Sequence, residues 1–172
     1  MNKLNARKQH TITFISQTRF NSQTYGLHSA AILDLRRALS RRLNYDDLKD
    51  RKPKPEGSDT FLDHAYWLLN YWDFVAVGCY ETDLDFETVH LNLRGAVVRV
   101  VLELRCVIAE VRRTEPRAWQ HLVWLFLYFA DESDIRLAMP DLGPKPDFLS
   151  PQETFIWETN GGDWRRSSPR WF

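Results

Sequence analysis

Two rows of polar side chains in this sequence could do chemistry. On a helix over residues 58–80, projection at about 100° per residue places an amide and three carboxylates on one flank, namely Asp59, Asp63, Asn70 and Asp73. On a second helix through residues 93–111, the same projection groups Arg94, Arg105 and Arg112. Both flanks border apolar faces, where charges must be paired. The rows predict a ladder of carboxylate–guanidinium pairs or, alternatively, a polar groove that binds an anion through planar guanidinium groups.

A second candidate is a basic surface in the N-terminal third of the chain. It comprises Arg36, Arg37, Arg41 and Arg42, which lie outside the apolar row of a helix over 24–43. Residues 1–54 hold 12 Lys and Arg against 4 Asp, a net charge of about +8, and residues 55–172 hold 11 against 19 acids, about −8. The basic segment therefore folds onto an acidic body, or it binds nucleic acid, an anionic membrane surface or a protein partner.

Motifs for metal binding and for nucleophilic catalysis are absent from the sequence. The acidic run Glu81–Glu87 lacks the glycine and the register of a calcium loop. The five histidines are scattered without HExxH, and there is no CxxC, GxSxG, Walker loop or GxGxxG. The sequence thus predicts no metal and no cofactor, and it favours a protein that is not an enzyme.

Apolar spacing predicts the elements that position these side chains. Helices are expected over 6–20, 24–43, 58–80 and 93–111, and from Pro116 to about Ala130 or Leu137, with Ser58 or Asp59 as the cap of the third. Residues 44–57 are charged and contain two prolines, which predicts an exposed linker or loop. The expected fold is all-α, with five or six helices around a long central one in which Val100 and Leu104 are fully buried.

The chain divides near residue 138 into a helical domain, 1–138, and a C-terminal segment, 139–172. Prolines and glycines interrupt the C-terminal segment, which predicts irregular structure. Its aromatic side chains, Trp157, Trp164 and Trp171 among them, are too many for a disordered tail. We expect this segment to drape over the helical domain or to dock on a partner.

The composition, 44% hydrophobic and 27% charged, is that of a soluble globular protein. Cys79 and Cys106 lie in apolar runs and are expected to be reduced, buried residues of a cytoplasmic protein. The longest apolar run, Leu122–Ala130, is well short of the ~20 residues that span a bilayer, and the first ten residues lack the apolar stretch of a signal peptide. We expect no membrane span.

Three short motifs resemble a bacterial helical family, the domain of unknown function number 4760. They are Arg7-Lys8-Gln9-His10-Thr11, Leu69-Asn70-Tyr71-Trp72-Asp73 and Ala76-Val77-Gly78, which match an R-(K/R)-x-x-T step in an Arg-rich first helix and a later LNYYE-hhAhG helix. The resemblance covers residues 7–130. The sequence differs from many proteins of this family because we expect no N-terminal membrane helix in it, and its segment after Met139 lies outside the family pattern. It implies an all-helical fold and no particular activity.

Three functions remain open from the sequence. The first is a non-enzymatic bacterial cytosolic protein that binds another protein or a second copy of itself. The aromatic C-terminal segment supports this hypothesis. The second is a nucleic-acid-binding or nucleic-acid-processing protein of phage or mobile-element biology that uses the basic N-terminal helices. The third is an enzyme that acts through the acid and arginine groove.

Overall fold

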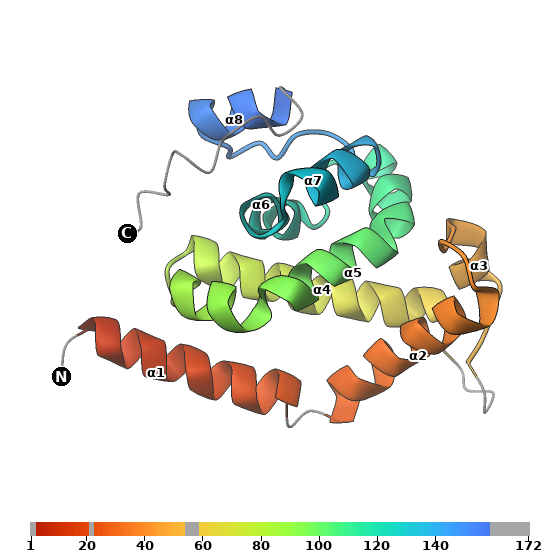
Figure 1. Cartoon of the computed structure of the whole chain (residues 1–172), viewed down its shortest axis with the longest axis horizontal. Helices are drawn as coiled ribbons and strands as arrows, with labels where there is room; N and C mark the ends of the chain where they lie inside the picture. Colours follow the sequence, from red (N-terminus) through yellow and green to blue (C-terminus); the bar gives the residue numbers. More distant parts are fainter. Residues whose placement is uncertain (1–2, 21–22, 54–58, 159–172) are drawn as a thin grey trace.

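The computed structural model describes residues 3–20, 23–53 and 59–158, and these residues form helices without any strand (Figure 1). The α-helices are α1 (Lys3–Ile15), α2 (Gln23–Leu39), α3 (Tyr45–Lys49), α4 (Phe61–Tyr80), α5 (Phe86–Thr114), α6 (Gln120–Phe129), α7 (Glu132–Ala138) and α8 (Pro151–Glu158). A π-helical turn, η1 (Ser16–Phe20), follows α1, and a 3-10 turn, η2 (Met139–Asp141), follows α7. The predicted all-α fold is confirmed.

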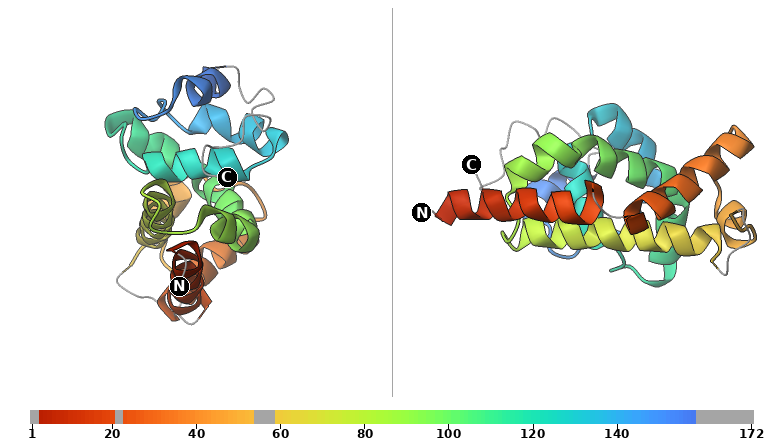
Figure 2. Two further views of the ribbon diagram at one scale, coloured as in Figure 1. Left: turned by 90° about the vertical axis from the view of Figure 1, so that its left-hand side faces the viewer. Right: turned by 90° about the horizontal axis from the view of Figure 1, so that it is seen from below.

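The helices are arranged in three layers. The long helices α4 and α5 form the middle layer, with α1 and α2 on one side and α6, α7 and α8 on the other (Figures 1 and 2). Helix α4 contacts α2, α3, α5 and α6, and α5 also contacts α6 and α7. The middle layer therefore carries most of the core and holds the side chains that face both outer layers.

The buried row of α5 is Leu93, Val97, Val101, Leu104 and Ile108. Leu104 has no exposed surface, as predicted. The prediction that Val100 is fully buried was wrong, because this side chain is only partly buried. Val101 takes its place because a step of four residues from Val97 stays closer to the apolar face than a step of three.

Two local predictions were wrong near the second helix. Residues 44–57 are not simply an exposed linker, because α3 lies within them and buries Leu48 completely. Asn44 caps α3 by accepting from Asp47 N at 2.8 Å. Helix α4 is capped by Thr60 rather than by Ser58 or Asp59, through a reciprocal capping box with Asp63. A five-residue helix and polar capping residues show no apolar period, so the spacing of apolar residues does not predict them.

The C-terminal segment packs on the body as far as it is described. Phe148 stacks on His121 of α6 with ring centroids 4.6 Å apart. Glu153 of α8 accepts from Trp124 Nε1 at 3.1 Å and from the Tyr128 hydroxyl, which ties α8 to α6. Helix α8 is an addition that the proline and glycine content did not indicate, and Trp164 and Trp171 lie outside the described residues.

No helix in the described ranges combines the length and the apolar character that crossing a bilayer requires.

Candidate anion-binding groove

The carboxylates predicted on α4 serve the ends of helices. Asp63 accepts from Thr60 N at 2.6 Å and from Thr60 Oγ1 at 2.7 Å, and these hydrogen bonds lower the pKa of its carboxyl. Asp73 accepts from Leu122 N at 2.8 Å, in the first turn of α6, and burial raises its pKa. Asn70 accepts from the indole of Trp119 at 2.7 Å. The acidic flank of α4 therefore anchors its own start and the start of α6.

Two of the arginines predicted on α5 donate to backbone carbonyls. Arg94 Nε donates to Phe129 O at the end of α6. Arg112, with no exposed surface, donates from Nε to Leu142 O at 2.7 Å, from Nη1 to Ala118 O at 2.6 Å and from Nη2 to the Pro144 carbonyl. Burial lowers the Arg112 pKa to about 10. Arg112 thus fastens the loop after α5 and the chain after η2 to the middle layer.

The predicted ladder between the two helices was wrong. Among the salt bridges of the described residues, none joins Asp63 or Asp73 to Arg94, Arg105 or Arg112. Arg112 instead binds carbonyls in the loop after α5 and in the chain after η2. Asp63, Asp73 and Arg94 bind backbone groups at the start of α4 and at the two ends of α6. This solution satisfies orphan amides and carbonyls that helix ends always leave.

Arg105 differs from these residues because it lies beside the predicted basic surface. A groove of about 800 Å³ is lined by five arginines, Arg36, Arg37, Arg41, Arg42 and Arg105. Its other lining residues are Leu33, Ser40, Leu102, Glu103 and Leu137. Helix α2 and the turn after it supply one wall, α5 the second, and α7 contributes Leu137. The structure therefore brings one member of the predicted polar rows, Arg105, to the predicted basic surface. The other six members do not line this arginine groove, namely Asp59, Asp63, Asn70, Asp73, Arg94 and Arg112.

Acidic side chains pair with each of these arginines. Arg36 pairs with Glu103, and Arg37 pairs with Asp34 at 3.5 Å. Arg41 lies 2.8 Å from Asp47, a carboxylate whose pKa the arginine's hydrogen bond holds low against the opposing effect of burial. These pairs partly neutralise the groove, and most are exposed enough to exchange with a ligand.

The most buried arginine of the groove, Arg105, pairs with Asp141 of η2. Its Oδ2 contacts Arg42 and lies 3.0 Å from Arg105 Nε. Arg105 is 6% exposed, yet among the described residues no acceptor completes a hydrogen bond with its Nε. Burial lowers the Arg105 pKa, the positive charge of Arg42 lowers it further, and Asp141 opposes both effects. Arg105 is a buried cation with incomplete pairing.

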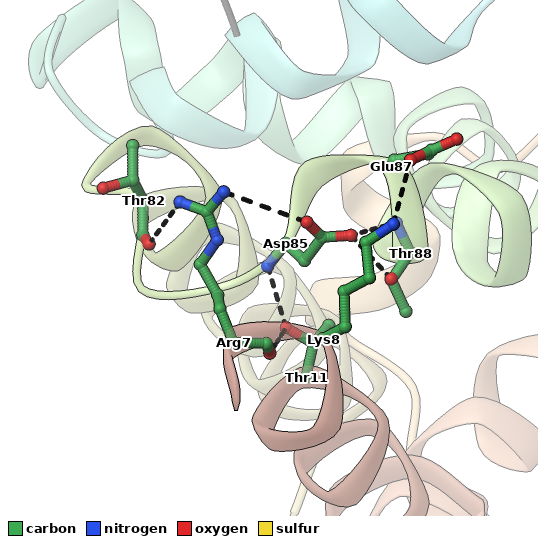
Figure 3. A network of polar contacts seen from close by, with 7 residues as sticks. All are labelled: Arg7, Lys8, Thr11, Thr82, Asp85, Glu87 and Thr88. Atoms are coloured by element: carbon green, nitrogen blue, oxygen red, sulfur yellow. Dashed lines mark hydrogen bonds and ion pairs between the residues drawn. The ribbon is translucent and has the colours of Figure 1, made fainter. Parts of the chain in front are cut away.

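The N-terminal motif that carries the family resemblance has a structural place (Figure 3). Arg7 Nη1 donates to Thr82 O at 3.3 Å, and its Nη2 lies 3.9 Å from Asp85. Buried Thr11 accepts from Asp85 N at 2.8 Å, and Lys8 pairs with Glu87 at 3.4 Å. The motif holds α1 on the turn between α4 and α5. With the pairs in the arginine groove, these contacts show the basic N-terminal part folded onto the acidic body.

Other reactive side chains lie away from this groove or are unsuited to catalysis. Burial raises the pKa of Cys79 to about 12 and that of Cys106 to about 11, so neither thiol is a nucleophile near neutral pH. His28 and His64, scattered in the sequence, meet with Nδ1 atoms 2.7 Å apart in a buried pair between α2 and α4. Within the described ranges, no three His, Cys, Asp or Glu side chains gather as a metal would require.

Sequence reasoning missed both acids of the site that pair with its arginines across elements, Asp141 and Glu103, and every lining residue that is not an arginine, namely Leu33, Ser40, Leu102 and Leu137 as well. Asp141 follows Pro140 in a stretch without an apolar period. Nothing in the local sequence marks it as the partner of Arg105 and Arg42, which precede it by 36 and 99 positions. The adjacent arginines at 36–37 and 41–42 were the sequence feature that indicated this site, and they indicated only the wall formed by α2 and the turn after it.

Comparisons with known proteins give a family and no activity. No curated protein and no solved structure matches the chain. The family model described as "Domain of unknown function (DUF4760)" matches residues 1–128, which include every arginine of the groove but not Asp141 or Leu137. The chain therefore belongs to the DUF4760 family.

Proposed function

We propose that this protein is a non-enzymatic interaction module that binds an acidic segment of another protein in the arginine groove. One observation carries the proposal: five guanidinium groups from α2, its following turn and α5 line a single groove, and one of them is buried with an unsatisfied donor. Arginine is enriched at protein interfaces because its planar fork binds carboxylates with two hydrogen bonds. A carboxylate-bearing ligand complements this lining.

The composition of the groove favours a protein segment over nucleic acid. Leu33 and Leu137 are 37% and 52% exposed at its rim, and exposed apolar surface suits a partner with apolar side chains. Glu103 and Asp141 pair with arginines of the groove and lower its net positive charge. Binding to a phosphate backbone depends on dense positive charge more than binding to an acidic segment with apolar side chains does. The nucleic-acid alternative rests on the basic charge of residues 1–54 and is one outcome of the test below.

The test measures binding of a fluorescent peptide in which Glu and Leu alternate, with a Gln-for-Glu peptide as the uncharged probe. The double variant Arg36→Gln/Arg37→Gln should lower affinity about tenfold, or ~1.4 kcal/mol, and this loss should shrink at high salt. The matched control is Arg113→Gln/Arg117→Gln, which removes two arginines that are 70% and 82% exposed elsewhere on the surface. The control should bind like wild type.

Two results would contradict the proposal. Equal affinity of both peptides for the wild-type protein would show that carboxylates are not recognised. Tighter binding of single-stranded DNA than of the acidic peptide at the same salt concentration, lost in the Arg36/Arg37 variant, would assign the groove to nucleic acid instead.

A further inference from the structure

Resting on the proposed function, we infer that Asp141 occupies, from within the chain, the subsite that a partner's carboxylate takes on Arg42 and Arg105. The turn η2 then acts as a built-in competitor, so the acidic partner must displace the Asp141 side chain. This inference names the two arginines that recognise the ligand and the contact that limits its affinity.

The subsite is formed by elements far apart in the sequence. Arg42 follows α2, Arg105 lies near the middle of α5, and both meet the same oxygen, Oδ2 of Asp141. The exposed fractions of the side chains are 54% for Arg42, 7% for Arg105 and 27% for Asp141. The subsite is therefore open from the side of Arg42 and closed behind Arg105, as a shallow pocket for one carboxylate would be.

Asp141 fills this subsite imperfectly. Its distance of 3.0 Å from Arg105 Nε is an ion-pair distance, but the geometry there makes no hydrogen bond. A guanidinium binds a carboxylate best when two N–H groups point at its two oxygens in one plane. A carboxylate on a partner is free to take that orientation. Asp141 has less of this freedom, because the backbone beside it is held in place and only its side chain can rotate.

The restraint on Asp141 comes from Arg112. Leu142, the next residue, is fully buried, and its carbonyl accepts from Arg112 Nε at 2.7 Å. The Pro144 carbonyl accepts from the same guanidinium. The backbone beside Asp141 is thus fastened to α5 independently of the arginine groove. Displacement therefore needs only rotation of the Asp141 side chain toward solvent and leaves η2 in place.

The test compares affinities for the Glu/Leu peptide after removal of single carboxylates. Asp141→Asn should bind the peptide about tenfold more tightly, ~1.4 kcal/mol, because the competitor loses its charge. Asp34→Asn is the matched control, since Asp34 pairs with Arg37 at the same groove but is 72% exposed. Its gain should stay below about twofold because it reports only the change in net charge. Asp141→Glu, which keeps a carboxylate, should stay near wild type.

A measurement on the unaltered protein covers the case in which Asp141→Asn does not fold. The Nε–H resonance of Arg105, assigned with Arg105→Lys, should shift when the Glu/Leu peptide is added and not when the Gln peptide is added. An unchanged resonance under saturating peptide would overturn the inference.

The outcomes separate the inference from the function on which it rests. If the peptide binds wild type, Asp141→Asn and Asp34→Asn equally, the groove binds acidic segments but Asp141 does not compete, and the inference fails alone. Weaker binding by folded Asp141→Asn would make Asp141 part of the binding surface and would also overturn it. If none of the three proteins binds the peptide, the proposed function fails and the inference with it.

Discussion

Arg105 and Arg112 lie seven residues apart on α5, about two helical turns, and the chain treats them in opposite ways. Both are buried, with exposed fractions of 6% and 0%. Arg112 donates from Nε, Nη1 and Nη2 to three backbone carbonyls. Arg105 faces a single carboxylate that it shares with Arg42, and its Nε makes no hydrogen bond to any described residue.

The comparison shows that burial alone does not reveal the role of an arginine. The role follows from whether the N–H groups of its guanidinium have hydrogen-bond acceptors. Burial lowers the pKa of both guanidinium groups. Nearby carboxylates oppose that effect at both positions, Asp73 and Asp147 for Arg112 and Asp141 and Glu103 for Arg105. Only Arg105 also has a neighbouring cation, Arg42, which lowers its pKa further. A satisfied arginine stabilises the fold, and an unsatisfied one beside another cation is suited to a ligand's negative charge.

The largest expected effect is the loss of Arg112. Arg112→Met should lower the free energy of unfolding by about 3–5 kcal/mol, because it strips the carbonyls of Leu142, Ala118 and Pro144 of their donors. Urea unfolding monitored by circular dichroism measures this. A change within about 1 kcal/mol would mean that water replaces the guanidinium freely, and the structural role assigned to Arg112 would be lost.

Leu104→Ala calibrates how much of such a loss comes from packing alone. Leu104 is completely buried on α5 next to Arg105, so its truncation should cost about 2–5 kcal/mol. Leu91→Ala on the same helix is the control, since Leu91 is 75% exposed and should change stability by less than about 0.5 kcal/mol. Similar losses in both variants would show that the buried row of α5 does not carry the core.

A substitution at Gly143 tests how closely the chain after η2 packs against Arg112. Its φ is +73°, and an added Cβ would lie 2.9 Å from Arg112 Cβ. Gly143→Ala should therefore destabilise by about 1–3 kcal/mol. Gly95→Ala, in α5 where a Cβ meets no atom within 4 Å, should instead stabilise by about 0.5–1 kcal/mol. A lower melting temperature for Gly143→Ala together with a higher one for Gly95→Ala would confirm that the chain after η2 packs closely against Arg112.

The sequence predicted these helices better than it predicted their polar contacts. Apolar periods located α4, α5 and α6 because long buried helices repeat their apolar face. Helix α3 escaped because five residues hold no period and depend on the Asn44 cap. Projection grouped Arg105 and Arg112 correctly on one flank, yet their partners lie in residues 118–144, which no projection of α5 can show.

Arg105→Gln should change stability least among the substitutions of buried side chains, and it is the sharpest test of the comparison. Its loss leaves no carboxylate stranded because Asp141 keeps its contact with Arg42. It also removes a buried cation that repels Arg42. Stability should therefore change by less than about 1 kcal/mol, far less than for Arg112→Met, while affinity for the acidic peptide falls.

Urea unfolding and peptide titration on the same Arg105→Gln preparation decide the matter. We expect an unfolding midpoint close to wild type together with a peptide affinity reduced about tenfold, ~1.4 kcal/mol. A stability loss of about 3 kcal/mol or more with unchanged peptide binding would make Arg105 a second structural clamp. Arg105 and Arg112 would then both stabilise the fold and would differ only in the number of hydrogen bonds that they make. Restoration of binding by Arg105→Lys would show that charge suffices at this subsite, whereas its failure would show that the planar guanidinium is required.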